Sequence, residues 1–353
     1  GTVDECRVRL DSQQVSVKSV LLNRGGYSYL TGPAVPGKEK QEAAPVPGGS
    51  TPSLPWTVRV GSVVLDDNRA EYGLLNHRPA AGFDPSFIVL STLDLAVDSI
   101  YNRGADIALQ IRRMAFTERS GLTVSDMTGD IGMDASGISL AGVTLKTPFS
   151  RIEANISAGE GILALAPDSP LKADLMADVN TKDLKYLYPA LIPPVLDGRI
   201  VSLALTAAGT LGDIGKAGLD ISSPGHVAFT ADGAARNVLD PGRMEASARF
   251  EGDFRDMAFL EALLPDSALR RRIAIPDRIR LRGTAGADKG AFSAASTLST
   301  DGGEIALQGR LDTRSEAYGI ELRCDSFPLN SFLPADSLGL LDLALQAGGS
   351  GFD

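Results

Sequence analysis

Apolar and polar residues alternate with a period of two along most of this chain. In 303–312, Ile305, Leu307 and Leu311 fall on one side, and charged and amide residues fall on the other. A strand points successive side chains to opposite faces of its sheet, so this period predicts strands with one apolar and one polar face. Turn-forming clusters such as Asp301-Gly302-Gly303 separate the runs, which favours antiparallel strands joined by short hairpins. The same alternation recurs at 56–65, 106–112, 138–145, 200–207, 244–250, 279–282 and 318–325.

The apolar positions of these runs are the candidate functional residues, because together they would line one continuous apolar face. We expect that face to be formed by Ile107, Leu109, Ile111, Leu203, Leu205, Ile279, Leu281, Ile305, Leu307, Leu311, Ile320 and Leu322. A sheet with one apolar face must cover it. A second sheet would do so in a β-sandwich, whereas a curled sheet would cover its own face together with whatever lies inside.

A repeat of about 73 residues distinguishes these two arrangements. Leu184, Met257 and Leu329 stand 73 and 72 residues apart, each with an apolar residue three positions later and a proline beyond. That spacing predicts short amphipathic helices between groups of strands. In a repeat, each unit contacts mainly its neighbours, which favours the curled sheet over separate sandwiches. The predicted fold is therefore an all-β, elongated, curled antiparallel sheet with a groove and a few short helices.

The same patterns divide the chain into four parts. They are a strand group at 1–31, a proline-rich flexible loop at 32–55, a sheet segment at 56–182, and the repeated helix-plus-β segment at 183–353. The last part includes 341–349, which is similar in sequence to 201–209. Because this second copy begins another repeat, we expect the chain to be a piece of a longer array. The loop holds six prolines, which lack the backbone donor that a sheet needs. We therefore expect its removal to leave stability almost unchanged.

Charge and hydropathy exclude several classes of partner. The net charge of −10 argues against nucleic acid, since phosphate binding needs clustered Lys and Arg. The longest apolar runs, such as 190–196, are far shorter than the roughly 18 residues of a spanning helix. Any membrane anchor would then lie outside this sequence. Cys6 and Cys324 each continue an apolar alternation, so we expect two buried free thiols.

Motifs for catalysis or metal binding are missing from the sequence. His77 and His226 have no second ligand at metal-binding spacing, and no nucleophile elbow or phosphate-binding loop occurs. The carboxylates of 66–68 and of Asp94 and Asp98 are interpreted as solvated side chains, and so is the basic cluster 270–272. We expect no enzyme activity, no metal and no cofactor.

Several segments resemble one family. The resemblance lies in Phe83-Asp84-Pro85-Ser86-Phe87-Ile88-Val89-Leu90, Leu93-Asp94-Leu95, Glu118-Arg119-Ser120-Gly121-Leu122, Leu145-Lys146-Thr147-Pro148-Phe149-Ser150 and the helix at 183–187 with its following proline. Together they are similar to the AsmA-like superfamily, in particular to the large TamB-type proteins of Bacteroidetes. The similarity covers roughly residues 55–353, and 1–30 is consistent with it.

The resemblance implies a periplasmic protein anchored in the inner membrane of a Gram-negative bacterium. It implies a U-shaped "β-taco" sheet whose groove carries phospholipid acyl chains towards the outer membrane. An alternative within the family is a scaffold for outer-membrane β-barrel or autotransporter assembly with a TamA-type partner. An alternative of another class is a structural surface module or adhesin whose apolar face is fully covered by the protein itself.

Overall fold

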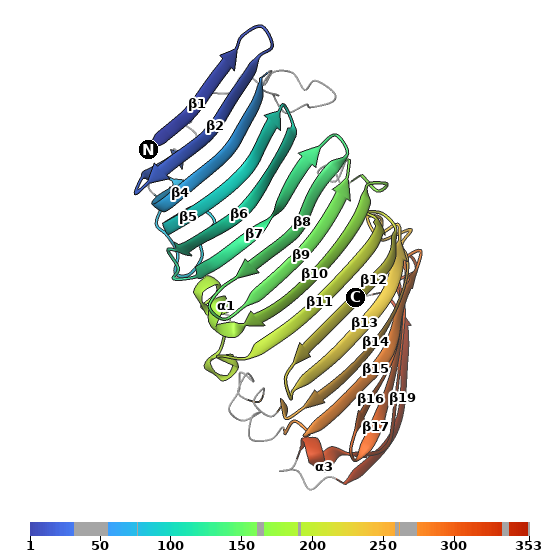
Figure 1. Cartoon of the computed structure of the whole chain (residues 1–353). Coiled ribbons are helices and arrows are strands. Elements are labelled where there is room, and N and C mark those ends of the chain that lie inside the picture. Colours follow the sequence, from blue (N-terminus) through green and yellow to red (C-terminus); the bar gives the residue numbers. More distant parts are fainter. Residues whose placement is uncertain are drawn as a thin grey trace. The chain divides into compact units, whose positions relative to one another are not determined.

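The computed structural model describes residues 1–31, 56–75, 77–160, 166–189, 192–257, 261, 274–333 and 339–351. These residues form 19 strands that belong to one curled, mainly antiparallel sheet, which is not closed (Figure 1). The predicted all-β fold with a curled antiparallel sheet and a few short helices is confirmed. The predicted proline-rich loop at 32–55, the basic cluster and most of the second predicted helix lie outside the described residues.

The chain divides into two compact units. Unit 1 comprises Gly1–Glu160 and Val179–Ile192, and unit 2 comprises Gly161–Asp178 and Pro193–Asp353. Helix α1 therefore belongs to unit 1, although the sequence places it in the repeated segment that begins at 183. The elements of unit 1 are β1 (Thr2–Arg9), β2 (Gln14–Asn23), β3 (Gly26–Thr31), β4 (Thr57–Leu74), β5 (Phe87–Arg103), β6 (Asp106–Glu118), β7 (Thr123–Asp134), β8 (Gly137–Lys146), β9 (Arg151–Gly159) and α1 (Thr181–Leu187).

Strand β10 (Pro170–Asn180) contributes residues to both units. The other elements of unit 2 are η2 (Pro194–Leu196), β11 (Ile200–Thr210), β12 (Ile214–Ser223), β13 (Val227–Arg236), β14 (Glu245–Arg255), β15 (Arg278–Asp288), β16 (Ala291–Thr300), β17 (Gly303–Asp312), β18 (Ala317–Pro328), α3 (Leu329–Phe332) and β19 (Leu340–Ser350). Helices α1 and α3 stand at two of the three predicted helix positions. Consecutive strands from β11 to β19 form antiparallel pairs.

Unit 1 contains a parallel pairing that the alternation did not predict. Strands β2 and β3 both run parallel to β4, with Gln14 opposite Thr57 and Thr31 opposite Leu74. A parallel pair cannot be closed by a hairpin, because the chain must return along the whole strand before pairing again. The expectation of antiparallel pairing is therefore wrong for β2 and β3 with β4.

Positive backbone φ angles interrupt the strands of unit 1. Glu5, Asp67, Thr92 and Ser99 have φ between 45° and 53°, and the β4–β5 and β5–β6 registers shift beside the last three. A β-bulge bends its strand and increases the local twist, so these positions contribute to the curl of the sheet. The buried apolar residues of this unit are, within the described ranges, Val89, Leu93, Val97, Ile111, Val124, Ala154 and Ala158.

The two cysteines differ in their surroundings. Cys324 is buried in β18, as expected, whereas Cys6 is exposed in β1, so the expectation for Cys6 is wrong. Every residue of β1 is exposed. Alternation places Cys6 on the side of Val8, but no described element packs over that side of β1.

Candidate functional site

The register of unit 2 aligns apolar residues across nine strands. Residues directly opposite each other in an antiparallel pair project from the same face of the sheet. Following these partners from β11 to β19 gives a first row of Leu203, Ile221, Phe229, Gly252, Leu281, Leu298, Ile305, Cys324 and Leu343. A second row beside it consists of Leu205, Leu219, Ala231, Phe250, Gly283, Ser296, Leu307, Leu322 and Leu345.

A third row on the same face is made almost entirely of small residues. It consists of Ala207, Ala217, Gly233, Ala248, Ala285, Ala294, Gly309, Ile320 and Ala347. A fourth row, from β13 to β19, consists of Ala235, Ala246, Ala287, Phe292, Leu311, Tyr318 and Gly349. We call the surface formed by these four rows the apolar face. Eight of the predicted residues belong to it, and Ile279 continues it beside Leu281.

The three remaining predicted residues lie in unit 1. Ile107, Leu109 and Ile111 of β6 stand opposite Met133, Ile131 and Gly129 of β7, so they too share one face of the local sheet. Whether either surface binds a ligand stays a prediction. Sequence reasoning missed the alanine and glycine rows, because residues without a large side chain give a weak alternation signal.

The small residues leave a hollow in the apolar face of unit 2. Its volume is about 520 Å³. Ala217, Gly233 and Ala248 line it, and larger residues border it, with Leu205 among them. Gly233 is needed here, since a Cβ at this position would lie 2.4 Å from the carbonyl oxygen of Ser247. The hollow is a shallow trough between apolar side chains.

The apolar face is open where it reaches the last strands. Leu307 is 43% exposed, and Ile320 and Leu345 are each 47% exposed. In a two-sheet sandwich, side chains at the centre of the inner face interdigitate with the facing sheet and are buried. All strands of the described residues belong to one sheet, so a two-sheet sandwich is excluded for that part of the chain.

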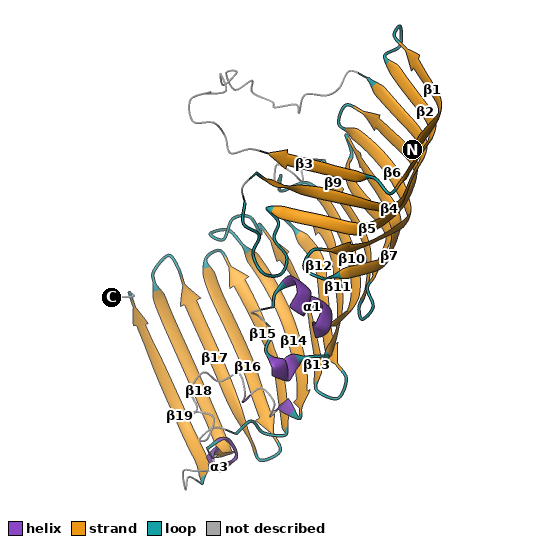
Figure 2. Ribbon diagram, turned by 90° about the vertical axis from the view of Figure 1, so that its left-hand side faces the viewer, coloured by secondary structure: helices purple, strands orange, loops and turns teal. Residues whose placement is uncertain are grey.

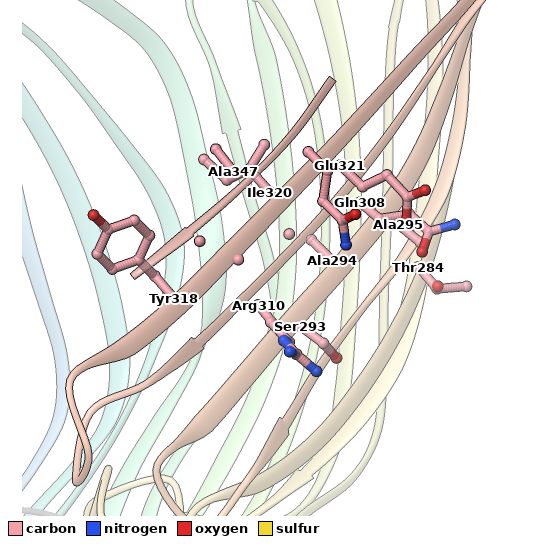
Figure 3. A pocket seen from close by; sticks show the side chains of 14 residues that line it. Thr284, Ser293, Ala294, Ala295, Gln308, Arg310, Tyr318, Ile320, Glu321 and Ala347 are labelled. Atoms are coloured by element: carbon pink, nitrogen blue, oxygen red, sulfur yellow. The ribbon is translucent and has the colours of Figure 1, made fainter. Parts of the chain in front are cut away.

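The opposite face of the same strands is polar, and it carries a second hollow of about 660 Å³. Figure 3 shows Tyr318 and Ile320 on one side of the strands, and Gln308, Glu321 and Thr284 on the other. The polar face also holds cross-strand and same-strand ion pairs, among them Arg323 with Glu321 at 2.6 Å. These amide and charged groups can form hydrogen bonds with water or a polar ligand, as on any solvated sheet face.

The segments that carry the family resemblance form buried hydrogen bonds in unit 1. Asp183, at the start of α1, accepts hydrogen bonds from the hydroxyls of Thr147 and Ser150. Ser150 in turn accepts one from the backbone N–H of Asn180 at 2.9 Å. Asn180 caps α1 by accepting from the N–H of Lys182 at 3.0 Å. The segment around 147–150 is thereby fastened to α1.

The resemblance segment at 118–122 contacts the loop that precedes Phe83. Arg119 donates to the carbonyl oxygens of Ala80 and Gly82 at 3.0 and 2.9 Å. Glu118 is buried and accepts from the N–H of Ser120 at 2.6 Å. Its Oε1 atom and the Ser120 hydroxyl have no hydrogen-bond partner within the described residues. These contacts organise loops at one end of the unit 1 strands and do not assemble a nucleophile with a base.

The carboxylate of Asp84 is held in its charged form. It accepts from the N–H of Ala80 at 2.9 Å, from the His77 ring at 2.7 Å and from the N–H of Ser86 at 2.9 Å. The Ala80 N–H is the main cause that lowers the pKa of Asp84 to about 2, with the His77 contact next. Pairing with Asp84 gives His77 a local structural role, which its position in the sequence did not reveal.

We expect the stability contribution of Asp84 to vanish in acid. Its folded pKa of about 2 lies below the unfolded value of 3.8, so the contribution is complete above about pH 5 and is largely lost once the pH has fallen to about 2. Thermal unfolding of the wild type and of Asp84→Asn should differ at neutral pH and converge near pH 2. A difference that persists unchanged at pH 2 would contradict this assignment.

The other carboxylates singled out in the sequence have structural roles. Asp94 accepts from the N–H of Asp67 at 3.0 Å, and Asp98 forms an ion pair with Arg112. Asn68, in contrast to its interpretation as a solvated residue, is only 1% exposed. His226 lies at a turn before β13. Within the described ranges, no group of three or more His, Cys, Asp or Glu side chains is placed to hold a metal ion.

No protein-family model matches the chain, and neither a curated protein nor a solved structure matches it. Within the described residues, no helix is both long and apolar enough to cross a membrane.

Proposed function

We propose that this chain binds phospholipid acyl chains along its apolar face and carries them between the inner and outer membranes in the periplasm, in support of outer-membrane biogenesis. The observation that carries the proposal is the alignment of four apolar rows on one face that no second sheet of the described residues covers. The family resemblance of the segments between 83 and 187 supports the membrane context.

The chemistry of the apolar face suits a ligand without polar anchoring points. Burial of hydrocarbon contributes about 0.8 kcal/mol per CH₂ group and has no directional requirement. Binding of this kind depends on area and shape alone, which is consistent with a face built from Leu, Ile, Phe, Ala and Gly. A hollow lined by small residues and bordered by larger ones offers an extended chain apolar surface to pack against.

The dimensions of the face also suit acyl chains. Nine adjacent strands at about 4.8 Å spacing give a face about 38 Å long. The hydrocarbon core of a bilayer is about 30 Å thick and is shared by two leaflets. One acyl chain therefore extends over about 15 Å. The face is therefore long enough for at least one phospholipid tail.

A charge on the apolar face should reduce lipid binding without unfolding the protein. Leu307 is partly exposed, so the carboxylate of Leu307→Asp can remain hydrated, and we expect thermal stability to change by only a few degrees. The loss of apolar contact and the new charge should lower the bound phospholipid about fivefold or more, which corresponds to about 1 kcal/mol. The measurement is mass spectrometry of lipids that copurify with the protein.

Ala306→Asp is the matched control, because Ala306 precedes Leu307 and projects from the polar face beside Arg323. It should retain the wild-type amount of lipid. Equal lipid in both variants, or a wild-type protein free of lipid, would contradict the proposal. Unfolding of Leu307→Asp alone would instead show that the face is closed in solution.

A further inference from the structure

Glu118 is a buried carboxylate without a counter-charge. It is 4% exposed and lies at the end of β6, opposite Leu90 on the same face of the sheet. None of the ion pairs within the described residues includes it. The guanidinium of the next residue, Arg119, donates instead to the carbonyl oxygens of Ala80 and Gly82. A charge that is removed from water is costly unless an opposite charge or several hydrogen-bond donors compensate it.

Two other carboxylates of the described residues, Asp84 and Asp183, are similarly buried but are compensated within the protein. Asp84 accepts three hydrogen bonds, and Asp183 accepts two from hydroxyl groups. Glu118 accepts one hydrogen bond through Oε2, from the N–H of Ser120 at 2.6 Å. Its Oε1 atom has no partner within the described residues. Of these three carboxylates, Glu118 is therefore the one that calls for a positively charged ligand.

The short turn that follows Glu118 supplies further oxygen atoms. The hydroxyl of Ser120 is buried and, like Oε1 of Glu118, has no hydrogen-bond partner in the described part of the chain. The carbonyl oxygens of Glu118 and Leu122 each accept one backbone N–H of the turn, which leaves each oxygen a second lone pair. Carboxylate, hydroxyl and carbonyl oxygens are the ligands that hard cations prefer in proteins.

Helix α1 and the loop before β5 lie against this turn. A Cβ at Gly121, whose φ is 99°, would be 3.0 Å from the Tyr186 ring of α1. The N–H of Phe83, in the loop, donates to the carbonyl oxygen of Leu187 at 3.1 Å. Figure 2 shows α1 beside a loop at the ends of the unit 1 strands. Because neither unpartnered oxygen is exposed to solvent, only a small ligand fits, and a headgroup tethered to a lipid is too large.

We propose that Glu118 and Ser120 bind a single monovalent inorganic cation of the size of sodium, which balances the charge of the carboxylate. A divalent ion is disfavoured, because calcium takes about six to eight oxygen ligands and several carboxylates. No group of three or more His, Cys, Asp or Glu side chains occurs among the described residues. The cation holds the turn 118–122 closed, and Arg119 links this turn to the loop at 80–82. The proposal is independent of lipid binding on the apolar face of unit 2.

Replacing tetramethylammonium chloride with sodium chloride should slow hydrogen exchange of the backbone amides in 118–122. Tetramethylammonium carries the same charge but is too large for a buried site. A ligand that binds only the closed turn reduces the open fraction by the factor 1 + [L]/Kd, so we expect exchange about fivefold slower or more in about 100 mM sodium. Peptides from β9 should exchange equally in both salts.

Glu118→Gln tests the role of the charge. The amide keeps the shape of the side chain and an acceptor for the N–H of Ser120, but it is neutral, so 118–122 should exchange equally in the two salts. Glu153→Gln is the matched control, because it removes a partly exposed carboxylate of β9 that pairs with Arg151. It should retain the full response to sodium.

Ser120→Ala tests the hydroxyl and keeps the backbone N–H that holds the carboxylate. The sodium effect should become severalfold smaller in this variant. Equal exchange of the wild type in both salts would overturn the proposal, and so would a sodium effect that survives in Glu118→Gln. If Glu118→Gln does not fold, an undiminished sodium effect in Ser120→Ala contradicts the proposed site.

Discussion

Deleting residues 33–54 is expected to detach strands β1–β3 from β4. In the parallel pairing, Thr31 lies opposite Leu74 while Thr57 begins β4, so the connection must return along 17 residues of β4, or about 56 Å. After the deletion, only three residues remain between Thr31 and Thr57, and they reach about 14 Å at most. Hydrogen exchange should show unprotected amides in 1–31 of the variant and protected amides in the wild type.

This expectation reverses the one drawn from composition, which treated the proline-rich segment as dispensable. The control replaces 33–54 with a Gly/Ser linker of equal length, which keeps the reach of the connection and removes its sequence. The control should keep β1–β3 protected. Protection of residues 1–31 in the deletion variant would show that the parallel register is wrong. Loss of protection with the linker would show that sequence, and not length, is required.

Replacing Asn68 with Asp should destabilise the same part of unit 1 by about 3–5 kcal/mol. Asn68 is almost completely buried; its Oδ1 accepts from the N–H of Gly25 at 2.8 Å, and its Nδ2 donates to the carbonyl oxygens of Leu22 and Asp66. The carboxylate of the variant has the same shape, but it places an oxygen against two carbonyl oxygens without a donor. Denaturant unfolding measures the loss.

Asn102→Asp is the matched control for this substitution. Asn102 also donates to two carbonyl oxygens, those of Gly104 and Asp106 at 3.2 Å, but it is only half-buried. Water can solvate the new carboxylate there, so the expected loss is about 1 kcal/mol or less. If the two variants lose similar stability, burial of Asn68 is not the reason for its importance.

The fold class and the unit 2 face could be predicted from the sequence because each depends on local order. An alternation such as that of Ile305, Leu307 and Leu311 fixes the face of a regular strand by itself. Regular pairing from β11 to β19 then carries that assignment from strand to strand. The bulges at Thr92 and Ser99 could not be predicted in this way. A single residue with a positive φ changes which side chains share a face of the strand, and neither residue type marks such a position in the sequence.

Pairing direction, exposure and the polar contacts were decided by the tertiary structure. Alternation is the same in parallel and antiparallel strands, so nothing within β2 or β4 indicated their parallel pairing; only the length of the connection bears on it. Cys6 continues an apolar pattern and is still exposed, since exposure depends on what packs over a strand. Asp183 contacts Thr147 and Ser150, more than thirty residues away, and no spacing rule predicts such a meeting. The sequence thus determines which side of each strand is apolar, and the packing of distant segments determines which of those sides is covered.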